Sequence, residues 1–178
     1  MIDIDFLAPL VIAARTLLAL VFLTAAIGKL RDHDAFHNQV HAYRILSERL
    51  VALASTAIPS AELALGLMLP TGLLPLGTGF AAAALLFVFA GAMAVNLRRG
   101  RRHIDCGCFQ GRAAQHLSMG VVLRTAGLGL CGLGAAFPVV ASLSDAVQGL
   151  VAGGILFVLF TTIASLPAFG RQRPRISL

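Results

Sequence analysis

The chain has 178 residues, of which 58% are hydrophobic and only 12% are charged, and its mean hydropathy is +0.87. A soluble domain carries about 25% charged residues, so this composition excludes an ordinary soluble fold and indicates a membrane protein. In such a protein, the net charge of +6 indicates orientation by cytosolic lysine and arginine, not binding to nucleic acid.

Five apolar segments are long enough to cross a bilayer, because a transmembrane helix needs roughly 20 mostly apolar residues. They lie near residues 7–30, 50–69, 73–97, 117–140 and 146–169. The first begins after the acidic residues Asp3 and Asp5, whereas a cleavable signal peptide begins with basic ones. We find no separate soluble domain and no repeat. We therefore predict a single all-α integral membrane domain over residues 1–178, a polytopic helix bundle with about five transmembrane helices.

The first connection, residues 31–49, is longer than a turn. Phe36, Val40, Tyr43 and Leu46 recur there at helical spacing with polar residues between them. Asp32 or Asp34 is suited to cap a helix start. We expect a short amphipathic helix in the membrane interface.

Three histidines, His33, His37 and His41, fall at i, i+4 and i+8 on one flank of this short helix. A stripe that faces solvent or lipid headgroups is the favoured interpretation, because their spacing is a weak ligand pattern. A metal site is the alternative.

Two ionisable residues, Arg15 and Glu62, lie inside the first and second predicted spans. Charged residues within a membrane are costly and are candidates for a functional site. Counted from the outer ends of their spans, both lie at a depth of roughly 10–12 Å. We expect them to meet, either as a structural ion pair or as part of a site. Pro59 is expected to open the helix before Glu62, and Arg124 in the fourth span is shallow enough to snorkel.

The basic residues other than Arg15 and Arg124 are distributed asymmetrically. They flank the first and third connections and follow the fifth span: Lys29, Arg31, Arg44, Arg49, Arg98, Arg99, Arg101, Arg102, Arg112, Arg171, Arg173 and Arg175. With five spans they all fall on one side, and the other side has only Asp3, Asp5 and Asp145. The positive-inside rule then predicts an external amino terminus and a cytoplasmic carboxyl terminus.

The third connection contains the most polar run of the chain, residues 96–109, with Cys106 and Cys108 one residue apart. Cations favour the reactive thiolate, and Arg101 and His103 supply positive charge that Asp105 partly opposes. A disulfide across one residue closes a small, strained ring that is easily reduced. The pair therefore suits a dithiol that passes electrons, at a loop that the charge distribution places in the cytoplasm.

Two alternatives to redox chemistry remain open for this loop. One is a pair of inert surface thiols, and the other is a metal site formed by Cys106, Cys108, His103 and His116. Zinc sites usually separate paired cysteines by two to four residues, so the spacing fits poorly. The third cysteine, Cys131, lies about 21 Å along the fourth span and is interpreted as a small apolar residue at a helix contact. The neighbouring glycines Gly127, Gly129, Gly132 and Gly134 favour close helix packing.

Several of these residues together resemble the methylamine utilisation protein MauE family. They are Arg15 with Lys29, Tyr43-Arg44, Pro59 to Leu63 with Gly66, and Asn96 to Arg101 leading into Asp105-Cys106-Gly107-Cys108-Phe109. The similarity extends from about Arg15 to Arg124, and the Arg-Gly-Arg to Cys-Gly-Cys-Phe run is its specific part. The family pattern has glycine or a similar residue directly after the Cys-Gly-Cys-Phe run, whereas this chain has Gln110 before Gly111. This departure leaves the core of the motif intact.

The resemblance implies an accessory protein of the bacterial cytoplasmic membrane, related to DoxX-like proteins. Such proteins are thought to support maturation of the methylamine dehydrogenase small subunit, which is rich in disulfides and carries a tryptophan-derived quinone. It also implies a thioredoxin-like partner. Maturation takes place outside the membrane, whereas the charge distribution places the cysteines inside. Either the protein relays electrons across the membrane, with a membrane quinone or a partner protein completing the relay, or the topology is inverted.

The leading hypothesis is thus a thiol-redox accessory factor for maturation of an exported disulfide-containing protein, not a freestanding enzyme. Its site residues would be Cys106 and Cys108, supported by Arg101, His103, Asp105, Arg15 and Glu62, with no metal. The alternative is a small-solute transporter that uses an Arg15–Glu62 pair on the substrate path.

Overall fold

The computed structural model describes residues 4–101 and 117–169, and every regular element in these ranges is a helix. The elements are α1 (Ile4–Arg31), α2 (His33–Ala42), α3 (Glu48–Met68), the 3₁₀ turn η1 (Leu69–Thr71), α4 (Pro75–Arg98), α5 (Met119–Ala135) and α6 (Leu143–Phe169). The predicted all-α bundle is confirmed, as is the order of five long helices with one short helix after the first.

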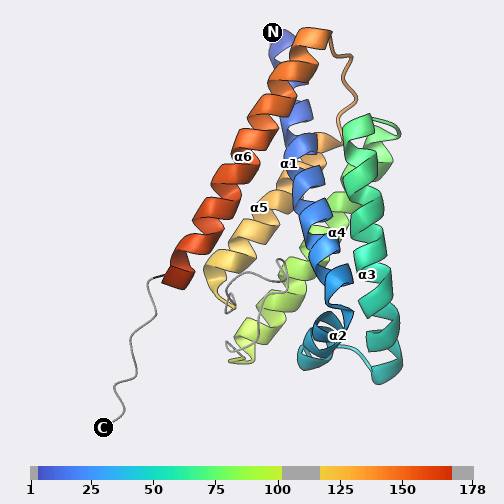
Figure 1. Cartoon of the computed structure of the whole chain (residues 1–178), viewed down its shortest axis with the longest axis vertical. Helices are drawn as coiled ribbons and strands as arrows, with labels where there is room; N and C mark the ends of the chain where they lie inside the picture. The colour runs from blue at the N-terminus through green and yellow to red at the C-terminus, as the bar shows by residue number, and fades with distance from the viewer. Residues whose placement is uncertain (1–3, 102–116, 170–178) are drawn as a thin grey trace.

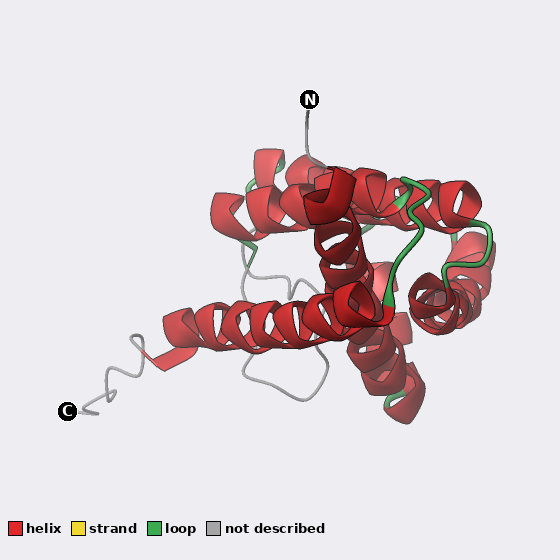
Figure 2. Cartoon of the chain, turned by 90° about the horizontal axis from the view of Figure 1, so that it is seen from above, coloured by secondary structure: helices red, strands yellow, loops and turns green. Residues whose placement is uncertain are grey.

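Helix α1 is the central element of the bundle (Figure 1). It packs against α3, α5 and α6, and α4 packs along α5. Seen from above, α6 lies apart from α4 on the far side of α1 (Figure 2). The middle of the bundle is formed by buried apolar residues of α1 such as Leu18 and Phe22, which pack against Leu65, Leu86 and Leu128 of the neighbouring helices.

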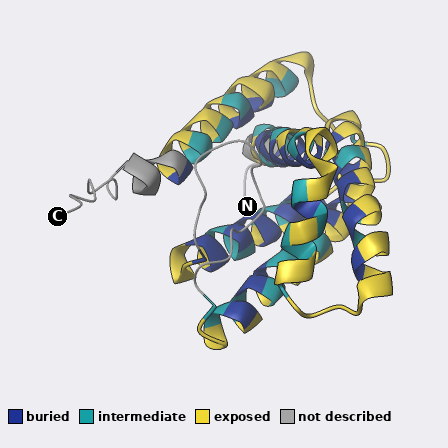
Figure 3. Ribbon diagram, turned by 60° about the horizontal axis from the view of Figure 1, so that its bottom comes forward, coloured by how far each residue is buried: buried dark blue, intermediate teal, exposed yellow. Residues whose placement is uncertain are grey.

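The outward faces of the long helices are largely exposed (Figure 3). They carry many large apolar residues, such as Leu53, Phe80, Leu130 and Ile155. In water such a surface would be strongly unfavourable, whereas a bilayer of hydrocarbon solvates it. In the part of the chain that the structure describes, four helices have the length and hydropathy to cross a membrane, over Leu7–Arg31, Glu48–Thr71, Pro75–Arg98 and Leu143–Ala164. The fold is therefore that of a polytopic helical membrane protein.

Helix α5 differs from the predicted fourth span, 117–140, because it ends at Ala135 and has only 17 residues. Pro138 explains the early end. Proline lacks the backbone N–H that a helix requires and disfavours helical geometry in the residue before it. The prediction was made from hydropathy alone and was wrong at this end. The other four predicted spans agree with the observed helices to within three residues.

The short helix expected in the first connection is α2, which begins at His33 and ends at Ala42. Asp32 caps it, since its Oδ1 accepts a hydrogen bond from the backbone N–H of Ala35 at 3.1 Å. Phe36 is its buried residue and points into the bundle. This helix lies at the end of the bundle where α1 and α4 end and α3 begins (Figure 1).

Glycines allow the helices to approach closely. A Cβ atom on Gly132 of α5 would lie 2.9 Å from the backbone N of Ala83 in α4, and one on Gly129 would lie 3.0 Å from the ring of Phe87. Gly127 and Gly134 have open space instead. The predicted packing role is thus confirmed for Gly132 and Gly129 and wrong for Gly127 and Gly134.

Candidate functional site

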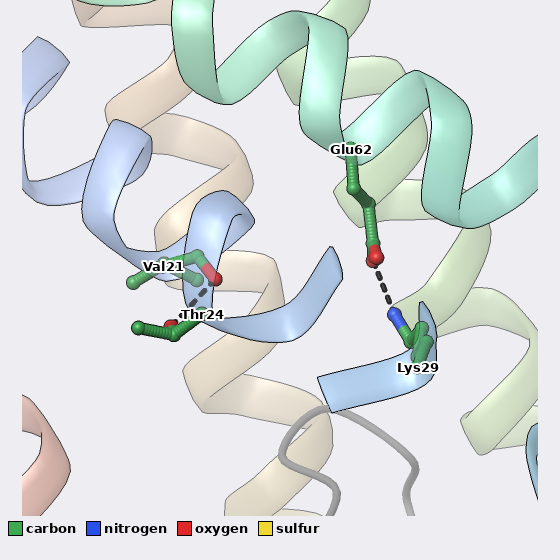
Figure 4. Close-up of polar contacts among 4 residues, drawn as sticks. All are labelled: Val21, Thr24, Lys29 and Glu62. Atoms are coloured by element: carbon green, nitrogen blue, oxygen red, sulfur yellow. Dashed lines mark hydrogen bonds and ion pairs between the residues drawn. The ribbon is translucent and has the colours of Figure 1, made fainter. Parts of the chain in front are cut away.

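The intramembrane glutamate Glu62 forms an ion pair with Lys29, not with Arg15 (Figure 4). Lys29 Nζ donates a hydrogen bond to Glu62 Oε1, and the two residues are 2% and 1% exposed. The pair joins the last turn of α1 to the middle of α3. A buried charge is tolerated only when it is paired and hydrogen-bonded, so these two residues depend on each other.

The predicted Arg15–Glu62 pair is wrong because of the register between the two helices. Gly66 of α3 lies against Leu23 of α1, where an added Cβ would be 2.7 Å from Leu23 Cγ. Arg15 precedes Leu23 by eight residues, and Glu62 precedes Gly66 by four in the antiparallel helix. At 1.5 Å per residue, Arg15 and Glu62 are therefore separated by about 18 Å along the bundle axis.

Arg15 instead binds the end of α5. Its Nε donates to the carbonyl oxygen of Ala135 at 3.0 Å, and its Nη2 donates to that of Phe137 at 2.9 Å. The last carbonyls of a helix have no partner within the helix, and a cation there is also favoured by the helix dipole. Arg15 also approaches η1, because its Nη1 lies 3.1 Å from where a Cβ of Gly72 would be. Its role in this structure is to hold α1, α5 and the η1 turn together.

Two phenylalanine rings complete the surroundings of Lys29. The centroids of the Phe36 and Phe89 rings each lie 5.1 Å from Lys29 Nζ. A cation over an aromatic ring within about 6 Å is attracted by the ring's electron-rich face. The ammonium group is thus held between α2 and α4 as well as by Glu62.

Lys29 lies beside the first connection, as the sequence predicted, but its burial was not predicted. One signal could have revealed its burial: Leu18, Phe22, Ala25 and Lys29 follow one another at spacings of four, three and four. These spacings define one face of a helix, and all four residues are buried. Lys29 thus continues the core face of α1.

Arg124 of α5 lies near the same centre. Its guanidinium carbon is 5.0 Å from the centroid of the Phe160 ring in α6. A small cavity of about 30 Å³ between the helices is lined by both Arg124 and Glu62. That volume exceeds the roughly 10–15 Å³ that one water molecule needs. Arg124 therefore contacts α6 and lines this cavity, and its expected snorkelling stays a prediction.

The sequence-predicted thiol site falls outside the described residues. Cys106, Cys108, His103 and Asp105 all lie in 102–116, and their role stays a prediction. Arg101 is described: its backbone N–H donates to the carbonyl of Asn96 at 3.0 Å, just after Gly100 with φ +75°. The cysteine loop thus follows directly from the end of α4.

The sequence comparisons assign the family. The family model of methylamine utilisation protein MauE matches residues 7–138. The methylamine utilization protein MauE of Paracoccus denitrificans is 39% identical over 170 residues, which cover 91% of this chain and 90% of that protein. The chain belongs to the MauE family.

Other MauE proteins are similarly related. Those of Paracoccus versutus and Methylorubrum extorquens are 39% and 38% identical, over 91% and 82% of this chain and 89% and 80% of their own lengths. No solved structure matches. The region matched by the MauE family model includes the Lys29–Glu62 pair, Arg15 and the Cys106–Cys108 loop, and it ends before α6.

Two further predictions concern His37 and Cys131. Among the described residues, no group of three or more His, Cys, Asp or Glu side chains is placed to hold a metal ion. His37 Nδ1 lies 3.2 Å from Ser55 Oγ, which joins α2 to α3. Cys131 packs against the apolar core at the α5 contact, as the sequence predicted.

Proposed function

We propose that this MauE-family protein is an accessory factor of methylamine utilisation in the bacterial cytoplasmic membrane. It would support maturation of an exported disulfide-containing protein, the small subunit of methylamine dehydrogenase, by thiol–disulfide exchange at Cys106 and Cys108. The observation that carries the proposal is that the family match over residues 7–138 includes the Cys-Gly-Cys loop. The helical membrane bundle supports it by providing a fixed anchor for that loop.

The exchange proceeds in two steps. The Cys106 thiolate attacks a disulfide of a thioredoxin-like partner and forms a mixed disulfide, while one partner sulfur leaves as a thiolate. The Cys108 thiolate then attacks the Cys106 sulfur and releases the second partner sulfur. The pair is thereby oxidised to a disulfide by two electrons, and the partner is reduced to a dithiol. The same two steps in reverse oxidise the partner, and Cys106 and Cys108 have the same roles in both directions.

The described basic residues support a cytoplasmic loop. The end of α1, the start of α3 and the end of α4 lie at one end of the bundle (Figure 1) and carry Arg31, Arg49, Arg98 and Arg99. Arginine side chains favour the cytoplasmic side. In this orientation, electrons must cross the membrane between the loop and an exported protein, and a further redox group has to carry them.

Trapping of the partner tests the proposal. The Cys108→Ala variant cannot resolve the mixed disulfide, so it should accumulate a covalent complex with a thioredoxin-like protein, visible on a non-reducing gel. Cys131→Ala is the matched control, because Cys131 is partly buried against the apolar core and its loss should leave trapping unchanged. The proposal is refuted if neither Cys106→Ala nor Cys108→Ala traps a partner and the variant lacking both cysteines still supports maturation.

The transporter hypothesis loses its basis in the structure. It required Arg15 and Glu62 to meet on a substrate path. Arg15 binds the end of α5 and Glu62 binds Lys29, so no such pair forms.

A further inference from the structure

A second cavity lies between α2, α3 and α4 beside the end of α1. Its volume is about 180 Å³, and an engineered cavity of roughly 150 Å³ holds a benzene molecule. It therefore has room for one substituted six-membered ring. The walls are mainly apolar and aromatic, formed by residues such as Phe36, Val40, Tyr43, Ile58 and Phe89, and they include one cation, Lys29, and one amide, Gln39.

The cavity opens at the apolar surface of the bundle. Val88, 65% exposed, lines it together with the exposed residues Ile45 and Leu46. Val88 belongs to α4, a helix with the length and hydropathy to cross a membrane. The opening thus faces the hydrocarbon of the bilayer, and a ligand that enters through it has to be lipid-soluble.

Lys29 is a hydrogen-bond donor with capacity left over. An ammonium group has three N–H donors, and one of them is bound to Glu62. The rings of Phe36 and Phe89 also lie close to Nζ, and both rings line the cavity. Buried donors of this kind are usually satisfied by an acceptor, so the cavity is suited to a ligand that brings one.

The charge state of this centre limits the kind of acceptor. Glu62 compensates the charge of Lys29, so the cavity offers a donor without a net positive charge. An anionic headgroup such as a phosphate would then meet little attraction and would have to be desolvated. A neutral carbonyl avoids that cost. The required ligand is thus lipid-soluble, has a ring, and carries a neutral carbonyl oxygen.

We propose that this cavity binds the ring of a membrane quinone. One ring carbonyl accepts a hydrogen bond from Lys29 Nζ, the ring packs against Phe36 and Phe89, and the tail leaves past Val88 into the bilayer. Binding of the quinone does not depend on the proposed function, but transfer of electrons from the cysteine pair to the quinone rests on it. Oxidation of the Cys106–Cys108 dithiol to a disulfide releases two electrons and two protons, and a quinone takes up both to become a hydroquinone.

The chain contains a built-in probe for this binding. Tyr43 lines the cavity and is the only tyrosine in a protein that has no tryptophan. Quinones quench tyrosine fluorescence at short range. Titration of the purified full-length protein in detergent with decylubiquinone, a short-tailed benzoquinone, should therefore quench Tyr43 emission along a saturable curve.

A cavity-filling substitution supplies the decisive comparison. Ala92 lines the cavity, whereas Ala84 is exposed on the same helix and does not. Ala92→Phe should weaken quinone binding by at least about tenfold, because the added ring occupies the ligand volume, while Ala84→Phe should bind as the wild type does. Both variants keep Lys29 and Glu62, so the ion pair is not disturbed.

Three outcomes would overturn the proposal. They are quenching that never saturates in the wild type, an equal affinity in Ala92→Phe, and equally strong competition by a phospholipid, which would mean that the site takes an acyl chain. The measurement does not involve the cysteines. Failure of quinone binding would leave partner trapping by Cys108→Ala unaffected, and failure of trapping would leave the quinone titration unaffected.

Discussion

The Lys29–Glu62 pair predicts a strongly non-additive double-mutant cycle. Lys29→Met leaves the Glu62 carboxylate without its counter-ion inside the bundle, and Glu62→Met leaves the ammonium group alone. Removing one partner of a buried ion pair costs about 3–5 kcal/mol, whereas replacing both by apolar residues is often neutral. The double variant should therefore be more stable than the sum of the two single effects predicts, by at least about 3 kcal/mol.

The two single variants should also differ from each other. After Glu62→Met, the ammonium group keeps the rings of Phe36 and Phe89, each 5.1 Å away. A desolvated cation–π contact is worth up to about 2 kcal/mol. Within the described residues, the Glu62 carboxylate has no second partner of this kind, since its Oε2 accepts no hydrogen bond. Lys29→Met should therefore be the more destabilising of the two.

A matched cycle between Arg15 and Glu62 is the control. These residues are separated by about 18 Å along the axis, so their effects should add to within about 0.5 kcal/mol. Unfolding by SDS in mixed micelles, followed by far-ultraviolet circular dichroism, gives the free energies for both cycles. An additive Lys29–Glu62 cycle, or a coupled Arg15–Glu62 cycle, would refute the ion-pair assignment and the helix register behind it.

Two further predictions concern packing and orientation. The Gly132→Leu variant should not give a monodisperse peak on size-exclusion chromatography, because the leucine side chain would collide with the backbone of α4. The control variant Gly127→Leu should elute as the wild type does, because Gly127 has open space around it. Equal behaviour of the two variants would contradict the close approach of α4 and α5. A membrane-impermeant maleimide should leave Cys106 and Cys108 unlabelled until cells are permeabilised, while Thr71→Cys in a variant without the native cysteines should label at once. Immediate labelling of Cys106 or Cys108 would reverse the predicted topology and bring the thiols to the side where maturation takes place.

Local properties of the chain were predictable from the sequence. The long apolar segments predicted the helices α1, α3, α4 and α6 because hydropathy and length alone determine whether a helix is stable in a bilayer. A cap of α2 at Asp32 or Asp34 was predictable, and Asp32 takes this role, because a cap depends only on residues within one turn. The Cys-Gly-Cys loop and its basic neighbours were likewise visible in the sequence, as was the resemblance to the MauE family that the comparisons confirm.

The partners of the buried charges were decided only by the tertiary structure. Counting residues from the expected span ends placed Arg15 and Glu62 at equal depth, but span ends are uncertain by several residues. The register of α1 on α3 is set by the contact of Gly66 with Leu23. In this register Glu62 lies beside Lys29, and Arg15 binds carbonyl oxygens at the end of α5. Hydropathy determines which helices lie in the membrane. Close packing between side chains determines the axial register and the rotation of one helix relative to its neighbour.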